Sequence, residues 1–197
     1  MSRVPRSMRA GLGGLVLALA LAVGACGGSD PDQPSSPAAS ASADPQAAYP
    51  ATDLGASDLI GHMAATGDLA LLQSLRPTTA DYQALFEPDF AERAQRAYEK
   101  QMWSSMPTTP KPWADPDQTE VRVWGAKTED IRKWTTAVRQ NFPGGYNKIK
   151  HYLKPGLTMY SIKVVRPGDD LGMAFNGLTH VNGHWAYFPK PWRVLDS

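Results

Sequence analysis

Residues 171–188 read LGMAFNGLTHVNGHWAYF, and this stretch decides the fold of the chain. Within it, Asn182 and Gly183 separate two runs that are rich in apolar and β-branched residues. An Asn-Gly pair in this setting is the strongest short-range signal for a β-hairpin, because both residues tolerate the positive φ angles of a tight turn. We therefore predict antiparallel strands over residues 171–181 and 184–188.

The length of this turn also sets the register of the hairpin. A two-residue loop makes Val181 the partner of His184 and His180 the partner of Trp185. Because side chains alternate along a strand, the two histidines point to opposite faces and cannot jointly hold one metal ion. We expect no metal and no other cofactor.

Two further strands are expected before the hairpin. Residues 157–165 form an apolar run, and a Pro-Gly-Asp-Asp turn at 167–170 reverses the chain into the next strand. Residues 120–124 alternate between polar and apolar side chains, which is typical of a half-buried strand. We also predict a short strand over residues 148–153.

The part of the chain that precedes these strands has helical periodicity. Gly67 and Pro77 end the first two expected helices, and residues 104–118, which contain four prolines, are expected to form a loop. The expected helix starts are Ser57 or Asp58, Asp68, Thr78 and Pro88.

A further helix is expected to begin at Thr128, because four residues after it fall on one helical face. These are Ile131, Trp134, Thr135 and Val138. Helices followed by an antiparallel meander predict an α+β domain, with the helices packed on one face of a curved antiparallel sheet.

The N-terminus has the anatomy of a secretory signal peptide. Three arginines precede an apolar run over residues 12–23, and two small residues stand before Cys26. The motif Val23-Gly24-Ala25-Cys26 resembles the lipobox of bacterial lipoproteins. That resemblance implies cleavage after residue 25, a diacylglyceryl group on Cys26, and a place on the outer face of the bacterial cytoplasmic membrane.

Two alternatives to the lipoprotein signal remain open. An uncleaved transmembrane helix needs about 20 apolar residues, more than this run offers. In an ordinary secreted protein, Cys26 would be a chance residue after the cut. Because Cys26 is the single cysteine of the chain, it cannot form an internal disulfide, and modification by lipid accounts for it best.

The rest of the chain divides into a tether and one domain. Residues 26–52 are rich in Gly, Ser, Pro and Ala and predict a disordered tether, whereas residues 53–197 are long enough for a single domain with one core. Loss of three arginines with the signal changes 20 basic against 19 acidic side chains to 17 against 19, a net charge of −2. This balance excludes a global basic field for nucleic-acid binding.

The expected order of elements resembles the nuclear transport factor 2-like superfamily of cystatin-like cone folds. The residues that carry the resemblance are Val181-Asn182-Gly183-His184-Trp185, which look like the hairpin motif near the end of those domains. The ending at 188–195, FPKPWRVL, is similar to that of exported proteins of this type. The resemblance implies a cone-shaped domain, often dimeric, but no particular function, because this fold hosts many activities.

One candidate ligand site follows from the hairpin register. If the face that carries His180 and Trp185 lines the interior of a cone, His180 would lie beside Tyr160 and Asn176 as a polar group in an apolar pocket. In the alternative, which we favour, His180 faces solvent and the opposite face forms the core. That opposite face would carry Met173, Phe175, Val181 and Phe188.

These features favour a lipid-anchored extracytoplasmic module that binds a small apolar ligand or an envelope protein. The alternative is a small-molecule enzyme, isomerase-like or dehydratase-like, with its pocket around His180. Against the enzyme, the only acids of the meander, Asp169 and Asp170, lie in a turn. Residues 146–154 are basic and aromatic, and they would suit either an anionic surface or an exposed edge strand.

Overall fold

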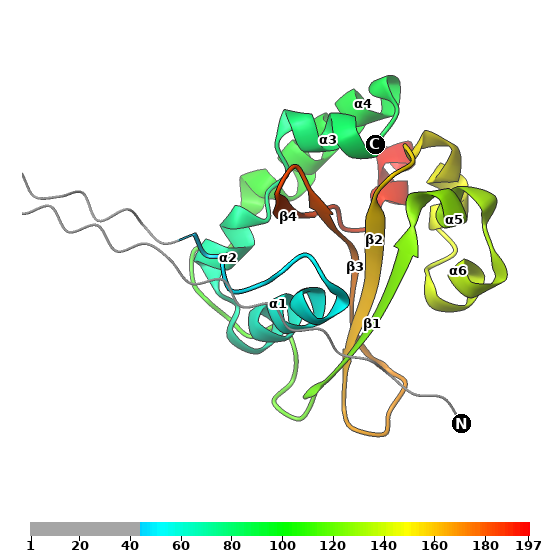
Figure 1. Cartoon of the computed structure of the whole chain (residues 1–197). Helices are drawn as coiled ribbons and strands as arrows, with labels where there is room; N and C mark the ends of the chain where they lie inside the picture. The colour runs from blue at the N-terminus through cyan, green and yellow to red at the C-terminus, as the bar shows by residue number, and fades with distance from the viewer. Residues whose placement is uncertain (1–43) are drawn as a thin grey trace, which may run out of the picture. The chain divides into compact units, whose positions relative to one another are not determined.

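The computed structural model describes residues 44–197 (Figure 1). The predicted signal peptide, Cys26 with its predicted lipid anchor, and residues 26–43 of the predicted tether lie outside the described residues. Within residues 44–197, no helix has the length and apolar character needed to cross a bilayer.

The predicted meander is confirmed as one antiparallel sheet. Its strands are β1 (Glu120–Lys127), β2 (Thr158–Val165), β3 (Gly172–Val181) and β4 (His184–Tyr187), in the order β1-β2-β3-β4. The β3–β4 hairpin has the predicted register, with Val181 opposite His184 and His180 opposite Trp185. Its turn residues have positive φ angles, 49° at Asn182 and 87° at Gly183, as a tight hairpin turn requires.

Four helices precede the sheet. They are α1 (Asp53–Thr66), α2 (Leu69–Ser74), α3 (Thr79–Leu85) and α4 (Pro88–Gln101), and a short 3₁₀ turn, η1 (Trp103–Ser105), follows them. The first helix begins earlier than predicted, because the hydroxyl of Thr52 accepts a hydrogen bond from the Gly55 N–H (3.1 Å) and caps the helix there. Gly67 ends it with φ 63°, and Asp68 and Thr78 cap α2 and α3.

The prediction of one helix from Thr128 is wrong, because the helix is interrupted at Trp134. Two helices form instead, α5 (Thr128–Lys133) and α6 (Thr136–Asn141), and Trp134 between them adopts a left-handed conformation with φ 53°. The hydroxyl of Thr135 accepts a hydrogen bond from the Val138 N–H (3.4 Å) and starts the second helix. A local side-chain bond thus replaces continuous helical bonding.

The predicted strand over residues 148–153 is also wrong. Residues of this segment belong to helix α7 (Tyr146–Ile149) and the 3₁₀ turn η2 (Lys150–Tyr152). Tyr146 and Ile149 are both fully buried, and their spacing of three residues places them on one side of a helix, not of a strand. The lysines therefore do not protect an edge strand.

Helices cover both faces of the sheet, whereas one covered face was predicted. Residues 175–179 of β3 are all buried, although successive side chains of a strand point to opposite faces. In Figure 1, α1 lies on one side of β1 and β2, and α5 and α6 lie on the other side. The fold class is therefore α+β with a four-stranded antiparallel sheet between two groups of helices.

A β-bulge at Gly177 changes which side chains share a face. Tyr160 is opposite Leu178, yet Ser161 is opposite Asn176, so Gly177 is an extra residue on β3, with φ 102°. The alternation of side chains therefore reverses at this point. Asn176 lies on the face opposite His180, and Phe175 lies on the same face as His180. Both placements differ from the sequence-based expectation, which assumed an unbroken strand.

Candidate functional site

The structure brings three of the four predicted site residues together. The ring of Trp185 lies 5.6 Å from that of Tyr160 and 5.2 Å from that of His180, and both neighbours meet it at steep angles. Asn176 is not part of this group, because it lies on the opposite face and accepts a hydrogen bond from the Ser161 hydroxyl (2.8 Å).

His180 is half-buried against Trp185. No hydrogen bond joins its ring to any residue of the described part of the chain. Burial lowers the pKa of His180, and the neighbouring His184 lowers it further. Burial raises the pKa of Tyr160 to about 12, helped by the carboxylate of Asp53. These shifts favour the neutral imidazole of His180 and the neutral phenol of Tyr160, so the group is an aromatic cluster without a fixed charge at neutral pH.

The chain itself covers this aromatic cluster. Residues 44–52, which the sequence assigned to the tether, fold back over it. The Gln46 side chain donates from Nε2 to the Trp185 carbonyl (3.0 Å) and accepts at Oε1 from the Trp185 N–H (2.6 Å). The indole N–H of Trp185 donates to the Tyr49 carbonyl (2.8 Å). The backbone and the indole nitrogen of Trp185 thus have partners within the protein.

The carboxylate that sequence reasoning missed is Asp81, and it partners His184 instead of His180. Asp81 is fully buried, and its oxygens accept hydrogen bonds from the Thr78 N–H (2.7 Å) and hydroxyl (2.8 Å) and from the Asn182 amide (2.7 Å). His184 Nε2 lies 2.9 Å from the same carboxylate. The Thr-x-x-Asp spacing of a capping box was the sequence signal for this group.

The electrostatics of Asp81 suit a structural role. Burial alone would raise the pKa of Asp81, but the hydrogen bonds from Thr78 and Asn182 and the charge of His184 outweigh burial, so the pKa lies below its ordinary value. The ionised carboxylate ties the start of α3 to the β3–β4 turn. Neither Asp81 nor His184 lines the cavities described below. Within residues 44–197, no group of His, Cys, Asp and Glu side chains is arranged to hold a metal ion.

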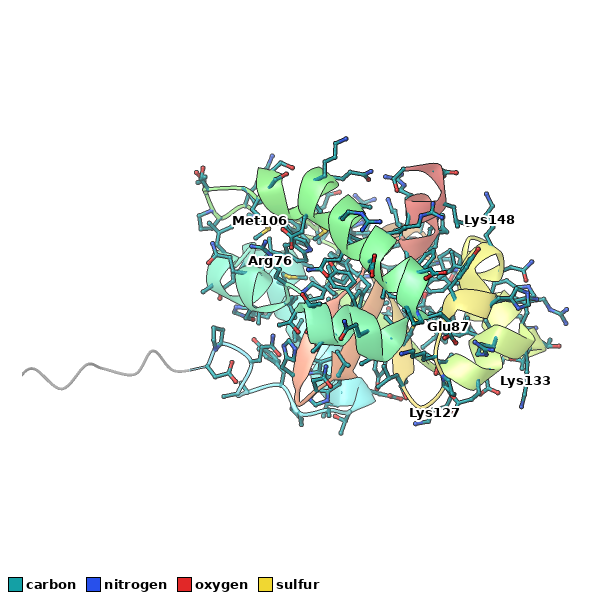
Figure 2. The ribbon with its side chains drawn as sticks, turned by 90° about the horizontal axis from the view of Figure 1, so that it is seen from above. Arg76, Glu87, Met106, Lys127, Lys133 and Lys148 are labelled. Carbon is teal, nitrogen blue, oxygen red and sulfur yellow. The ribbon has the colours of Figure 1, made fainter. Side chains whose placement is uncertain are left out.

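The cavity best suited to a ligand lies elsewhere, between α4, β3 and the C-terminal 3₁₀ helix η3 (Pro191–Asp196). Figure 2 shows η3 beside α4. The cavity has a volume of about 330 Å³, and its main lining side chains are apolar or aromatic. These are Tyr98, Met102, Trp113, Phe175, Tyr187 and Val194. We call it the aromatic cavity.

Several contacts hold the walls of the aromatic cavity in place. The rings of Trp113 and Phe175 stack at 5.7 Å, and the Tyr98 hydroxyl donates to the Pro189 carbonyl (3.0 Å). Lys190 has φ 50° between two prolines, an uncommon left-handed conformation for a residue other than glycine. This turn leads the chain from β4 into η3 and places Lys190 at the cavity lining.

Sequence reasoning did not find the aromatic cavity, because its walls come from four separate segments. Tyr98 lies on α4 and Met102 directly after it, and Phe175 was placed on the wrong face because the Gly177 bulge was not foreseen. The ending at 188–195 was noted only as a resemblance. No local pattern links these segments.

Comparisons with known proteins found no match: no protein-family model, no curated protein and no solved structure is similar to this chain.

Proposed function

We propose that this protein is a lipid-anchored extracytoplasmic binding module, and that the aromatic cavity is its ligand site. The observation that carries the proposal is this cavity of about 330 Å³ with aromatic walls. Ligand sites are typically concave and mostly apolar, with volumes of about 300–1,000 Å³. At the small end of this range, the cavity suits a small ligand or part of a longer one.

The anchor in this proposal rests on the N-terminal sequence. The lipobox-like motif that ends at Cys26 supports a diacylglyceryl modification and a place on the outer face of the bacterial cytoplasmic membrane. Two acyl chains hold a protein at a membrane stably, whereas one chain does not. The helices and the antiparallel meander are compatible with a cone fold of the nuclear transport factor 2-like type, which we propose on the hairpin motif that ends at Trp185.

Geometry favours binding over catalysis at the hairpin. An enzyme built around His180 would need a polar partner to orient the ring and room for a substrate. His180 instead packs against Trp185. The buried carboxylate of Asp81, which contacts the hairpin turn, is paired with His184 and not with His180. The isomerase-like or dehydratase-like alternative stays a prediction without a supporting observation.

Native mass spectrometry of the protein purified from its own envelope tests the proposal. We expect a bound small-molecule mass in the unmodified protein. The variant Ala97→Trp should lose it, because Ala97 lines the aromatic cavity and a larger side chain would fill the space. The control Ala70→Trp, at an exposed position on α2, should retain the ligand. A protein without any bound mass, or one whose ligand survives Ala97→Trp, would contradict this function.

A further inference from the structure

A basic groove adjoins the aromatic cavity along α4. It has a volume of about 450 Å³ and is lined by Arg93, Arg96, Lys100 and Ser197. Ala97 and Gln101 line both spaces, so the groove and the aromatic cavity lie next to each other along α4. Lys190 and Arg193 add two more cations at the aromatic cavity. No Asp or Glu side chain is among the described residues that line either space.

Acidic neighbours neutralise little of this charge. Arg96 lies 3.5 Å from Glu92 in an exposed pair, and Glu99, beside Lys100 on α4, is bound by Arg76 instead. Within residues 44–197, no ion pair involves Lys100, Lys190 or Arg193. In a mature protein with a net charge of −2, such a concentration of positive charge is local.

Cations beside an apolar cavity predict a ligand with two different ends. The walls formed by Trp113, Phe175 and Tyr187 favour burial of an apolar part, since burial stabilises in proportion to the apolar area removed from water. The cations favour a negative group at the mouth, where Arg and Lys form charge-assisted hydrogen bonds with carboxylate or phosphate oxygens. A neutral apolar ligand would form no ion pair with these cations.

We infer that the ligand is a single-chain anionic amphiphile. Its acyl chain would lie in the aromatic cavity, and its carboxylate or phosphate head would lie where this cavity adjoins the basic groove, between Lys190 and Arg193 of the cavity and Lys100 of the groove. This inference rests on the proposed function, because it assigns a ligand class to the same site. A fatty acid and a monoacyl phosphate share this chemistry.

The experiment measures equilibrium binding to the full anchored protein in phosphatidylcholine nanodiscs, with empty discs as background. Radiolabelled laurate, dodecyl phosphate and dodecanol have the same chain and differ in the head. We expect at least one of the two anions to bind about five-fold or more tightly than dodecanol, the range that a partly exposed ion pair supplies. If laurate binds more tightly than dodecyl phosphate, the ligand is a fatty acid; if dodecyl phosphate binds more tightly, the ligand carries a phosphate head.

The variant with Lys190→Gln and Arg193→Gln separates charge from folding. It should weaken binding of the preferred anion by about five- to ten-fold and weaken dodecanol binding far less, since glutamine removes the charge but keeps part of the side chain that lines the cavity. The control variant Lys127→Gln with Lys133→Gln removes two exposed cations elsewhere on the surface (Figure 2) and should bind like the unmodified protein.

Three results would overturn the inference. The first is dodecanol binding as tightly as the anions, and the second is equal loss of anion and alcohol binding in the Lys190 and Arg193 variant. Either would leave the proposed function standing, since an apolar ligand would still occupy the cavity. The third is that none of the three amphiphiles binds above empty discs; native mass spectrometry then decides whether another kind of ligand occupies the cavity.

Discussion

At the scale of single residues, the side chain of Gln46 makes the hydrogen bonds to β4 that a neighbouring strand would otherwise make. The strand β4 is an edge of the sheet, and edge strands expose unpaired backbone groups. The amide of Gln46 pairs with both the N–H and the carbonyl of Trp185, and the Tyr187 N–H donates to the Leu75 carbonyl (2.9 Å). A side chain and a helix end therefore cover this edge, and they protect it from pairing with other chains.

The variant Gln46→Ala should reduce the free energy of unfolding by about 2 kcal/mol, since each hydrogen bond contributes about 1 kcal/mol net and two to Trp185 are lost. Urea denaturation measures this change. Gln73→Ala, at an exposed position on α2, is the matched control and should change stability by less than about 0.5 kcal/mol. Equal effects of the two variants would show that Gln46 does not hold the edge.

Asp81→Asn should remove a pH-dependent part of the stability. The pKa of Asp81 is lowered in the folded protein, so its contribution is complete above the ordinary aspartate pKa of about 4 and is lost as the pH falls through the lower folded value. At neutral pH we expect a loss of about 1.5–3 kcal/mol, the range for hydrogen bonds to a charged group.

Urea denaturation at neutral and acidic pH checks the Asp81 prediction. The difference between Asp81→Asn and the unmodified protein should shrink as the pH falls from about 4 through the lower folded pKa of Asp81, because the folded protein then also carries a neutral side chain at residue 81. Asp89→Asn, at an exposed position in the first turn of α4, serves as the control. A difference that is independent of pH would mean that Asp81 acts through its shape and not through its charge.

At the scale of elements, the bulge at Gly177 determines the composition of both sheet faces. Without it, Phe175 would lie on the face opposite Leu178 and could not stack on Trp113 in the aromatic cavity. Gly177 has φ 102°, and a Cβ atom there would lie 2.0 Å from the Phe188 carbonyl oxygen. The close approach of β3 to the chain after β4 therefore requires glycine.

Gly177→Ala should destabilise the protein more than Gly156→Ala, and thermal unfolding compares the two. Both glycines have nearly the same positive φ, but no atom lies within 4 Å of a Cβ at Gly156. Gly156→Ala should lose about 1–2 kcal/mol from backbone strain alone. Gly177→Ala should lose about 1–3 kcal/mol more from the clash with Phe188. Similar losses would show that strand β3 can relax around the bulge.

At the scale of the whole molecule, the proposal joins a membrane anchor to a domain with a basic, apolar ligand site. An anchored module that binds single-chain anions would act where such molecules occur, at the surface of a bilayer. In this proposal the location depends on Cys26, because a chain that begins at residue 26 would carry a net charge of −2 and would gain little from anionic lipids by itself.

Cys26→Ala should release the protein from the membrane fraction, since the thiol is the site to which the diacylglyceryl group would be attached. Membrane fractionation and labelling with a palmitate analogue measure this outcome. Ser29→Ala, three residues away in the same segment, should stay in the membrane fraction and keep the label. Continued membrane association of Cys26→Ala would instead support the uncleaved transmembrane alternative for residues 12–23.

Local sequence patterns determined most of the elements that precede residue 128 and the three strands that end the sheet. The Asn182-Gly183 turn fixed the hairpin and its register, and the caps at Asp68 and Thr78 fixed two helix starts, because turn geometry and capping depend on residues only a few positions apart. The same local signals supported the α+β class. They gave a wrong prediction at Trp134, because the apolar residues keep their helical spacing across the position where the structure ends α5.

Only the tertiary structure decided which residues form a site. Gln46 and Trp185 are 139 positions apart, and the aromatic cavity joins α4, β3 and η3 with a loop residue, Trp113. The bulge at Gly177 lies where β3 pairs with β2 and approaches Phe188, and it places Asn176 on the face opposite His180. Contacts between distant segments depend on how the elements pack together, and no periodicity within one segment encodes that packing.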